Sequence, residues 1–248
     1  MQFDWKKMIW IGILLAAPLF LGGANGEGCG GKSVLENLGD DSTKEAKVEK
    51  ARIALDDRDF ATAIETLQEL CGTSLTAPTC DPEIVSLYAS AYAGRAGLDV
   101  FDLIKEGANQ PAASGATSYT LFSKHFSSPT AANVSDIGAA VSLLTSIPSR
   151  TPDQGLQLAI ASTSDLVIFL GSLTGGYNTT TGKPNALPAV SSVNAAALSR
   201  VLADVGDMDT GLTEANIGND NISGHIQQIQ QSLSGGSATT VVTFLGGI

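Results

Sequence analysis

Apolar side chains recur every three or four positions along most of this 248-residue chain, and that spacing fits helices rather than strands. The clearest run is Phe60, Ala63, Ile64, Leu67 and Leu70, which fall on one side of a predicted helix. Such a one-sided apolar face must be buried against another element. The sequence therefore predicts an all-α fold built of antiparallel helix hairpins.

The same spacing predicts further helices over residues 43–55, 81–92, 100–105, 137–147, 153–170, 189–205 and 222–233. Pro82 in the first position favours a helix that starts directly after Asp81. The run from Leu166 to Leu170 is apolar on all sides, which indicates a central helix; a strand is the competing interpretation. The closing segment TTVVTFLGGI favours a β conformation packed along a groove.

Composition excludes several classes of protein. Hydrophobic residues make up 43% of the chain and charged residues 16%, which argues against a disordered chain. Aromatic residues are only 6%, so the core is expected to consist of small side chains and close helix contacts. The net charge of −11 repels nucleic acid, and no basic stripe offsets it.

The N-terminal segment, residues 1–28, is typical of an export signal. Lys6 and Lys7 precede an uncharged apolar run from Met8 to Leu21, and small residues follow it. The run is shorter than the roughly 20 residues that a membrane span needs. An uncleaved N-terminal anchor remains the alternative interpretation.

Cys29 follows this segment and is preceded and followed by glycine, an arrangement that resembles a bacterial lipoprotein signal in which the cysteine becomes the lipidated N-terminus. The residue three positions before it is Gly26, where that signal usually has an aliphatic side chain. Cleavage after Ala24 is therefore an open alternative. Residues 29–42 are predicted to form a tether.

The other two cysteines, Cys71 and Cys80, flank the turn-rich segment GTSLTAPT and could pair in an oxidising compartment. Two free thiols are the alternative. If the two pair, Cys29 is left over, and lipidation would account for it.

Residues 26–33 match the P-loop pattern GxxxxGK[ST]. That motif works only between a buried strand and a helix, whereas here an export signal precedes it. Cleavage at Cys29 would also divide the motif. The sequence therefore argues against nucleotide binding.

The segment from residue 51 to residue 70, ARIALDDRDFATAIETLQEL, resembles a tetratricopeptide-repeat (TPR) helix–turn–helix. Asp59 and Phe60 correspond to the turn, and Ala63, Ile64 and Leu67 to the start of the second helix. The segment LYASAYAGRAGLD, residues 87–99, resembles another first helix. The resemblance covers about residues 43–105 and implies an α-solenoid stack that serves protein contact. Residues 43–106 are accordingly predicted as a TPR-like unit, 107–118 as a linker and 119–248 as a second helical unit.

Patterns for catalysis are missing from the sequence. His125 and His225 have no ligand partners at zinc spacing, and no GxSxG elbow occurs. Paired acids such as Asp56 and Asp57 lie in hydrophilic turns. No enzyme activity and no cofactor are expected.

One acidic segment, residues 204–221, is a candidate calcium loop through Asp207, Asp209 and Glu214. Its glycine stands one place too early for an EF-hand, and Gly218 occupies the place of the closing Glu. The simpler interpretation is an Asp/Asn/Gly connection between two helices.

The sequence thus predicts a non-enzymatic cell-envelope lipoprotein that acts as a protein-interaction scaffold. It would be lipid-anchored in the outer membrane and face the periplasm, or be soluble in the periplasm, and its partner would be an envelope protein or peptide. The residues predicted to touch the partner are Phe60, Leu67, Tyr88 and Tyr92. The alternative is a small-ligand or calcium-binding accessory protein of an envelope transport system.

Overall fold

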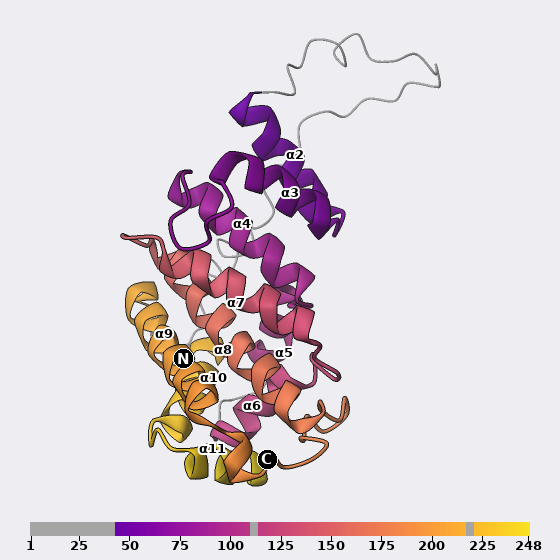
Figure 1. Ribbon diagram of the computed structural model, residues 1–248, viewed down its shortest axis with the longest axis vertical. Helices are drawn as coiled ribbons and strands as arrows, with labels where there is room; N and C mark the ends of the chain where they lie inside the picture. Colours follow the sequence, from indigo (N-terminus) through magenta and orange to yellow (C-terminus); the bar gives the residue numbers. More distant parts are fainter. Residues whose placement is uncertain (1–42, 110–113, 217–220) are drawn as a thin grey trace, which may run out of the picture. The chain divides into compact units, whose positions relative to one another are not determined.

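A computed structural model describes residues 43–109, 114–216 and 221–248 of the chain (Figure 1). These residues form ten α-helices and a single 3-10 turn, with no β-strand among them, so the predicted all-α class is confirmed. The helices are α2 (Lys44–Asp56), α3 (Phe60–Cys71), α4 (Pro82–Arg95), α5 (Val100–Ala108), α6 (Gly115–Ser123), α7 (Ala131–Thr145), α8 (Pro152–Thr174), η1 (Val190–Ser192), α9 (Ala195–Ala215), α10 (Asn221–Leu233) and α11 (Ala238–Gly246).

The helix boundaries follow from local chemistry in the sequence. Thr43 and Asp59 accept hydrogen bonds from the first free backbone N–H groups of α2 and α3. Thr130 and Thr151 each form a reciprocal capping box with the residue three positions later. The long helix α8 ends at Gly175, whose φ of 71° lies in the left-handed region that glycine adopts without strain.

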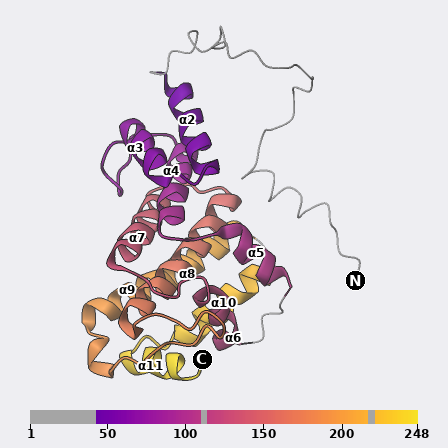
Figure 2. The same ribbon diagram turned by 90° about the vertical axis from the view of Figure 1, so that its right-hand side faces the viewer.

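Residues 42–248 belong to one compact unit. Six of its helices pack one on the next, whereas α5 and α6 depart from this order. Helix α2 packs on α3 and α3 on α4, and then α4 packs on α7, α7 on α8 and α8 on α9. The helices α5 and α6, which lie between α4 and α7 in the sequence, pack instead with α10 (Figures 1 and 2). One continuous hydrophobic core therefore runs from α2 to α11.

Helix α8 is the centre of this core. Its length and apolar composition would let it cross a membrane, yet most of its surface is buried by other helices of the protein. The run Leu166–Leu170 lies within it, so the helical interpretation of that segment is confirmed. Burial on all sides explains why this run shows no polar face.

Helices α8 and α9 cross at a pair of glycines, Gly155 and Gly211. A Cβ atom added at Gly211 would lie 2.5 Å from the carbonyl oxygen of Gly155 and 2.7 Å from the backbone nitrogen of Ala159. No side chain fits there, so the two backbones meet directly. This close approach agrees with the small-residue core expected from the composition.

Two sequence-based expectations about local structure were wrong. The segment predicted as a linker, residues 107–118, contains the start of α6, because Ser114 caps a new helix at Gly115. The C-terminal segment predicted as β-prone forms α11, in which Val241 and Leu245 lie one helical turn apart and are both buried. Tertiary burial outweighs the intrinsic strand preference of this segment.

Candidate functional site

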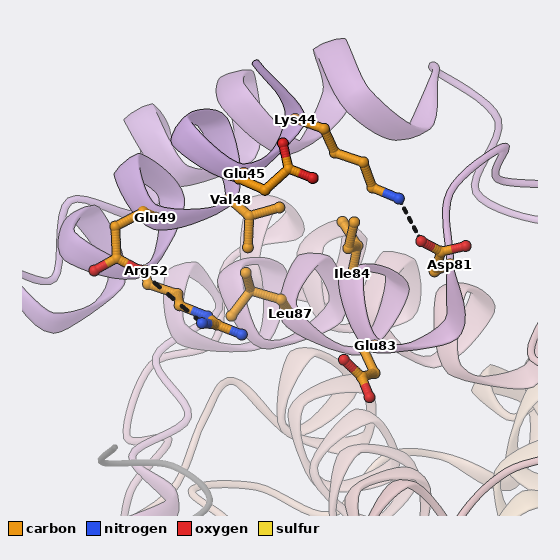
Figure 3. A pocket seen from close by; sticks show the side chains of 9 residues that line it. All are labelled: Lys44, Glu45, Val48, Glu49, Arg52, Asp81, Glu83, Ile84 and Leu87. Carbon is orange, nitrogen blue, oxygen red and sulfur yellow. Dashed lines mark hydrogen bonds and ion pairs between the residues drawn. The ribbon is translucent and has the colours of Figure 1, made fainter. Parts of the chain in front are cut away.

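A shallow groove lies between α2 and α4 on the surface of the described residues. Its volume is about 390 Å³, and it is open to solvent along one side. Val48 from α2 and Ile84 and Leu87 from α4 supply its apolar surface (Figure 3). Ile84 is buried, whereas Val48 and Leu87 are only partly covered. The groove therefore has an apolar floor that no other helix of the described chain covers.

Charged side chains surround this floor. Lys44 and Arg52 contribute two positive charges, and Glu45, Glu49, Asp81 and Glu83 contribute four negative ones. The amine of Lys44 bonds to Asp81, which closes one end of the groove. This hydrogen bond, together with the negative charge of Asp81, raises the pKa of Lys44, so the amine stays charged at neutral pH.

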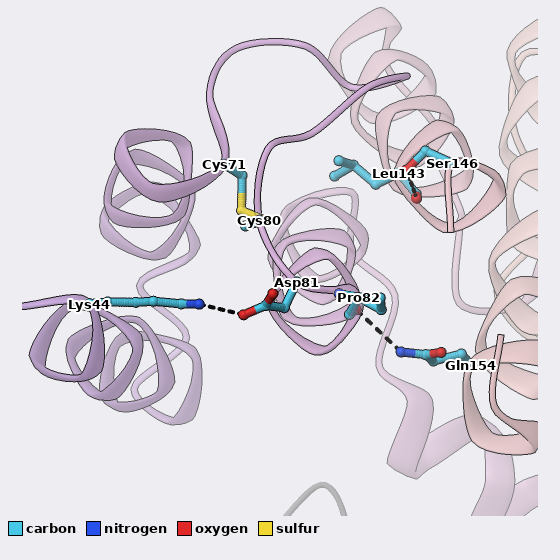
Figure 4. Close-up of a disulfide and its surroundings, with 8 residues drawn as sticks. All are labelled: Lys44, Cys71, Cys80, Asp81, Pro82, Leu143, Ser146 and Gln154. Carbon is cyan, nitrogen blue, oxygen red and sulfur yellow. Dashed lines mark hydrogen bonds and ion pairs between the residues drawn. A yellow bond between two sulfur atoms is a disulfide. The ribbon is translucent and has the colours of Figure 1, made fainter. Parts of the chain in front are cut away.

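The end of the groove at Asp81 is fixed by a disulfide (Figure 4). Cys71, the last residue of α3, is bonded to Cys80, with their Cα atoms 4.7 Å apart, so the predicted pairing is confirmed. Asp81 follows Cys80 directly and precedes the first residue of α4, Pro82. The carbonyl oxygen of Pro82 accepts a 3.2 Å hydrogen bond from Gln154 of α8. The groove edge is thus tied to both α3 and α8.

The residues predicted to touch a partner lie in different environments. Leu67 and Tyr88 are 0% exposed and belong to the core, so the prediction that they form a contact surface was wrong. Phe60 packs its ring over Gly94, where an added Cβ would lie only 2.2 Å from the ring. The helical spacing of these apolar residues, which suggested a contact surface for a partner, arises instead from the packing of α3 against α4.

Tyr92 is half-buried rather than exposed. Its hydroxyl lies 3.5 Å from that of Tyr88, and the guanidinium of Arg95 lies 5.1 Å from its ring centroid. Arg95 in turn donates two hydrogen bonds of 2.7 and 2.8 Å to Asp136 of α7. Tyr92 is therefore packed beside Arg95, the residue that joins α4 to α7, and it is not part of the groove lining.

The most perturbed acidic groups are buried between α8 and α9. Asp165 bonds to Arg200, whose Nη2 also donates a 3.0 Å hydrogen bond to the carbonyl oxygen of Val134 in α7. Burial, and then the neighbouring charge of Asp165, raise the pKa of Asp204 well above its ordinary value. Asp204 is 3% exposed, and its Oδ2 has no hydrogen-bond partner among the described residues. The pair lies in the helix interface and is not part of the groove lining.

The candidate calcium ligands lie on a helix and not in a loop. Asp207, Asp209 and Glu214 are all part of α9, which continues to Ala215. Asp209 accepts a 2.9 Å hydrogen bond from Gln230, and Glu214 accepts one of 2.9 Å from Arg150. Among the described residues, no cluster of three or more His, Cys, Asp or Glu side chains is arranged to hold a metal ion. These acidic residues are therefore spaced along a helix and do not form the loop that the calcium hypothesis requires.

Neither histidine lines the groove. His225 is fully buried, and its Nδ1 lies 2.9 Å from the hydroxyl of Ser118, which joins α10 to α6. His125 Nε2 lies 3.7 Å from Glu106 at the surface between α5 and α6. Cys29, Ala24 and the P-loop-like residues 26–33 lie outside the described residues.

The groove residues were not singled out from the sequence, although one signal was present. Helix α4 carries Ile84, Leu87, Tyr88 and Ala91, an apolar band too wide for contact with a single neighbour. Tyr88 and Ala91 are fully buried, and Leu87 extends the band to the groove. The width of the band indicated contact with more than one neighbour, but not which of its residues would remain uncovered.

Comparison with known proteins adds no assignment. No protein-family model matches the chain, and neither the curated proteins nor the solved structures contain a significant match.

Proposed function

We propose that this chain is a non-enzymatic cell-envelope lipoprotein that holds a partner protein or peptide in the groove between α2 and α4. The observation that carries this proposal is that the two walls of the groove come from alternate helices, α2 and α4. Helices α2 and α4 are not consecutive, because α3 lies between them in the chain. In TPR-type stacks alternate helices line one face, and that face holds the partner.

The packing order supports a solenoid interpretation. The helices α2, α3, α4, α7, α8 and α9 each pack on the next, and the alternate members α4 and α8 are also hydrogen-bonded. Gln157 of α8 donates hydrogen bonds of 3.1 Å to the carbonyl oxygen of Ser86 and 2.8 Å to the hydroxyl of Ser90. We interpret α5, α6, α10 and α11 as an additional layer that caps this stack.

The proposed location rests on the N-terminal sequence and on the disulfide. Residues 1–28 have the order of an export signal, and Cys29 is the proposed lipidation site. The Cys71–Cys80 bond fits an oxidising compartment such as the periplasm, since disulfides are rare in the cytosol. A lipid on Cys29 would anchor the helical unit through the tether of residues 29–42.

The proposal is tested by placing a photo-cross-linking amino acid at Leu87, in the groove, in the full chain within its own cell envelope. The matched control carries the same group at Glu65, an exposed position on α3 that does not line the groove. We expect a discrete protein adduct from position 87 and none from position 65. Equal adducts from both positions, or none from position 87, would contradict a partner in the groove.

A further inference from the structure

The groove between α2 and α4 has more acidic groups than its own basic groups neutralise. Lys44 is bonded to Asp81, and Arg52 approaches Glu49 at 4.0 Å. Each basic side chain of the lining is thus already next to an acidic one. Glu45 and Glu83 have no ion-pair partner within the part of the chain that the structure describes, and both are exposed.

The two acids come from the two walls of the groove. Glu45 lies on α2, one helical turn before Val48, and Glu83 is next to Ile84 at the start of α4, with its side chain directed away from α2 at the rim of the groove (Figure 3). An apolar side chain seated between Val48 and Leu87 would therefore have an unpaired carboxylate within one turn on either helix. This arrangement matches a ligand in which basic groups flank apolar ones.

The same features exclude other ligand classes. Phosphate-rich or acidic ligands would meet two unpaired carboxylates in a protein whose net charge is already −11. A metal ion would need several converging donors, and the described residues hold no such cluster. A volume of about 390 Å³ is at the small end of ligand sites, which fits a few side chains of a bound segment rather than a large organic molecule.

We propose that the groove binds a peptide segment of the partner in which Lys or Arg side chains flank leucine-like apolar side chains. This inference rests on the proposed function and adds the chemistry of the partner. The apolar side chains cover Val48 and Leu87, and the basic ones pair with Glu45 and Glu83. The negative charge of the whole protein speeds the encounter, so binding weakens as salt is added.

The test measures fluorescence anisotropy of short labelled peptides with the purified full chain. The probe alternates Lys pairs with Leu pairs; one comparison peptide replaces Lys by Glu, and another replaces Leu by Gly. We expect the Lys/Leu peptide to bind most tightly and to lose affinity between low and physiological salt. Equal binding of the Glu/Leu peptide, or of the Lys/Gly peptide, would overturn the proposal, because it requires both charge and apolar cover.

The double variant Glu45→Gln/Glu83→Gln localises the effect. Its control, Glu65→Gln/Asp56→Asn, removes the same charge from exposed positions outside the groove. Two exposed ion pairs correspond to about three- to tenfold in affinity, which is the weakening expected for the groove variant alone. Equal affinities of the two variants would refute the assignment of Glu45 and Glu83. All four positions are exposed, so circular dichroism should show unchanged folding.

The photo-cross-link at Leu87 separates this inference from the proposed function. If the Lys/Leu peptide reduces the partner adduct at position 87 and the Glu/Leu peptide does not, both statements are supported. If the adduct forms but the Lys/Leu peptide leaves it unchanged, the partner is in the groove and the chemistry proposed for it is wrong.

Discussion

The glycine crossing of α8 and α9 gives the sharpest test of the packing. In Gly211→Ala the new Cβ would lie 2.5 and 2.7 Å from two backbone atoms of α8 and 3.0 Å from the Cβ of Ala159. Backbone atoms cannot rotate away as a flexible side chain can, so the helices must separate. Overpacking of this kind costs about 1–3 kcal/mol, and the rigid neighbours place this site at about 2–3 kcal/mol.

Alanine also favours the helix over glycine by about 1 kcal/mol, which offsets part of that cost. The control is Gly206→Ala on the same helix, because a Cβ at Gly206 would meet no atom within 4 Å. It should therefore gain stability by up to about 1 kcal/mol, whereas Gly211→Ala should lose about 1–2 kcal/mol. The two variants then differ by roughly 2–3 kcal/mol.

Thermal unfolding followed by circular dichroism measures this difference. For a domain of this size about 1 kcal/mol shifts Tm by roughly 2–4 °C, so Gly211→Ala should melt roughly 4–12 °C below Gly206→Ala. If Gly211→Ala melts as high as Gly206→Ala, the α8 and α9 backbones do not meet at these glycines. The argument for a core of closely packed small residues would then fail at its centre.

Three further predictions concern acid groups, the disulfide and the N-terminus. Burial raises the pKa of Asp204 in the folded protein, so between the ordinary and the raised pKa the folded state binds more protons than the unfolded state. The free energy of unfolding therefore falls as pH rises through this interval. Urea unfolding should accordingly find Asp204→Asn more stable than the wild type at pH 8 and closer to it at pH 4; a constant difference at both pH values would contradict the raised pKa. Replacing Cys71 and Cys80 together by Ser should lower the free energy of unfolding by roughly 2–3 kcal/mol, and unreduced mass spectrometry of the wild type should show the linked peptide. Cys29→Ser should abolish lipidation and release a soluble or unprocessed protein; a wild type with no lipid and an N-terminus at Asn25 would disprove the lipoprotein assignment.

The sequence predicted helices well wherever a cap and an apolar face coincide. Pro82 is an example, because the sequence predicted it as the first helical residue and α4 begins there; Phe60, placed in a turn by the TPR resemblance, is instead the first residue of α3. The prediction failed where burial by distant segments decides the conformation, as in α11, or where helix and turn residues are mixed, as in Asp207 to Glu214. Glycine and aspartate suggested a loop there, but Gly211 is required by the α8 contact.

The site was harder to predict than the fold, because a helical apolar face does not reveal which of its residues remain uncovered. Leu67 and Leu87 occupy similar positions in the apolar faces of α3 and α4, yet Leu67 is fully buried and Leu87 lines the groove. The difference arises from the tertiary arrangement, in which α3 has neighbours on both sides and α2 and α4 leave space between them. The Cys71–Cys80 pairing could be predicted only as one of two alternatives, because the spacing in sequence does not fix whether the two Cβ atoms approach each other closely enough.

The hydrogen bonds from Gln154 and Gln157 to α4 have a consequence for the order in which the chain can fold. They join residues 67 to 72 positions apart, so α4 acquires these partners only after the first turns of α8 have been synthesised. A fragment that ends at residue 130 lacks α7 and α8 and leaves the inner side of α4 open to solvent. We therefore expect such a fragment to be protease-sensitive, and the contacts of α4 with α7 and α8 to form later than the local contacts among α2, α3 and α4.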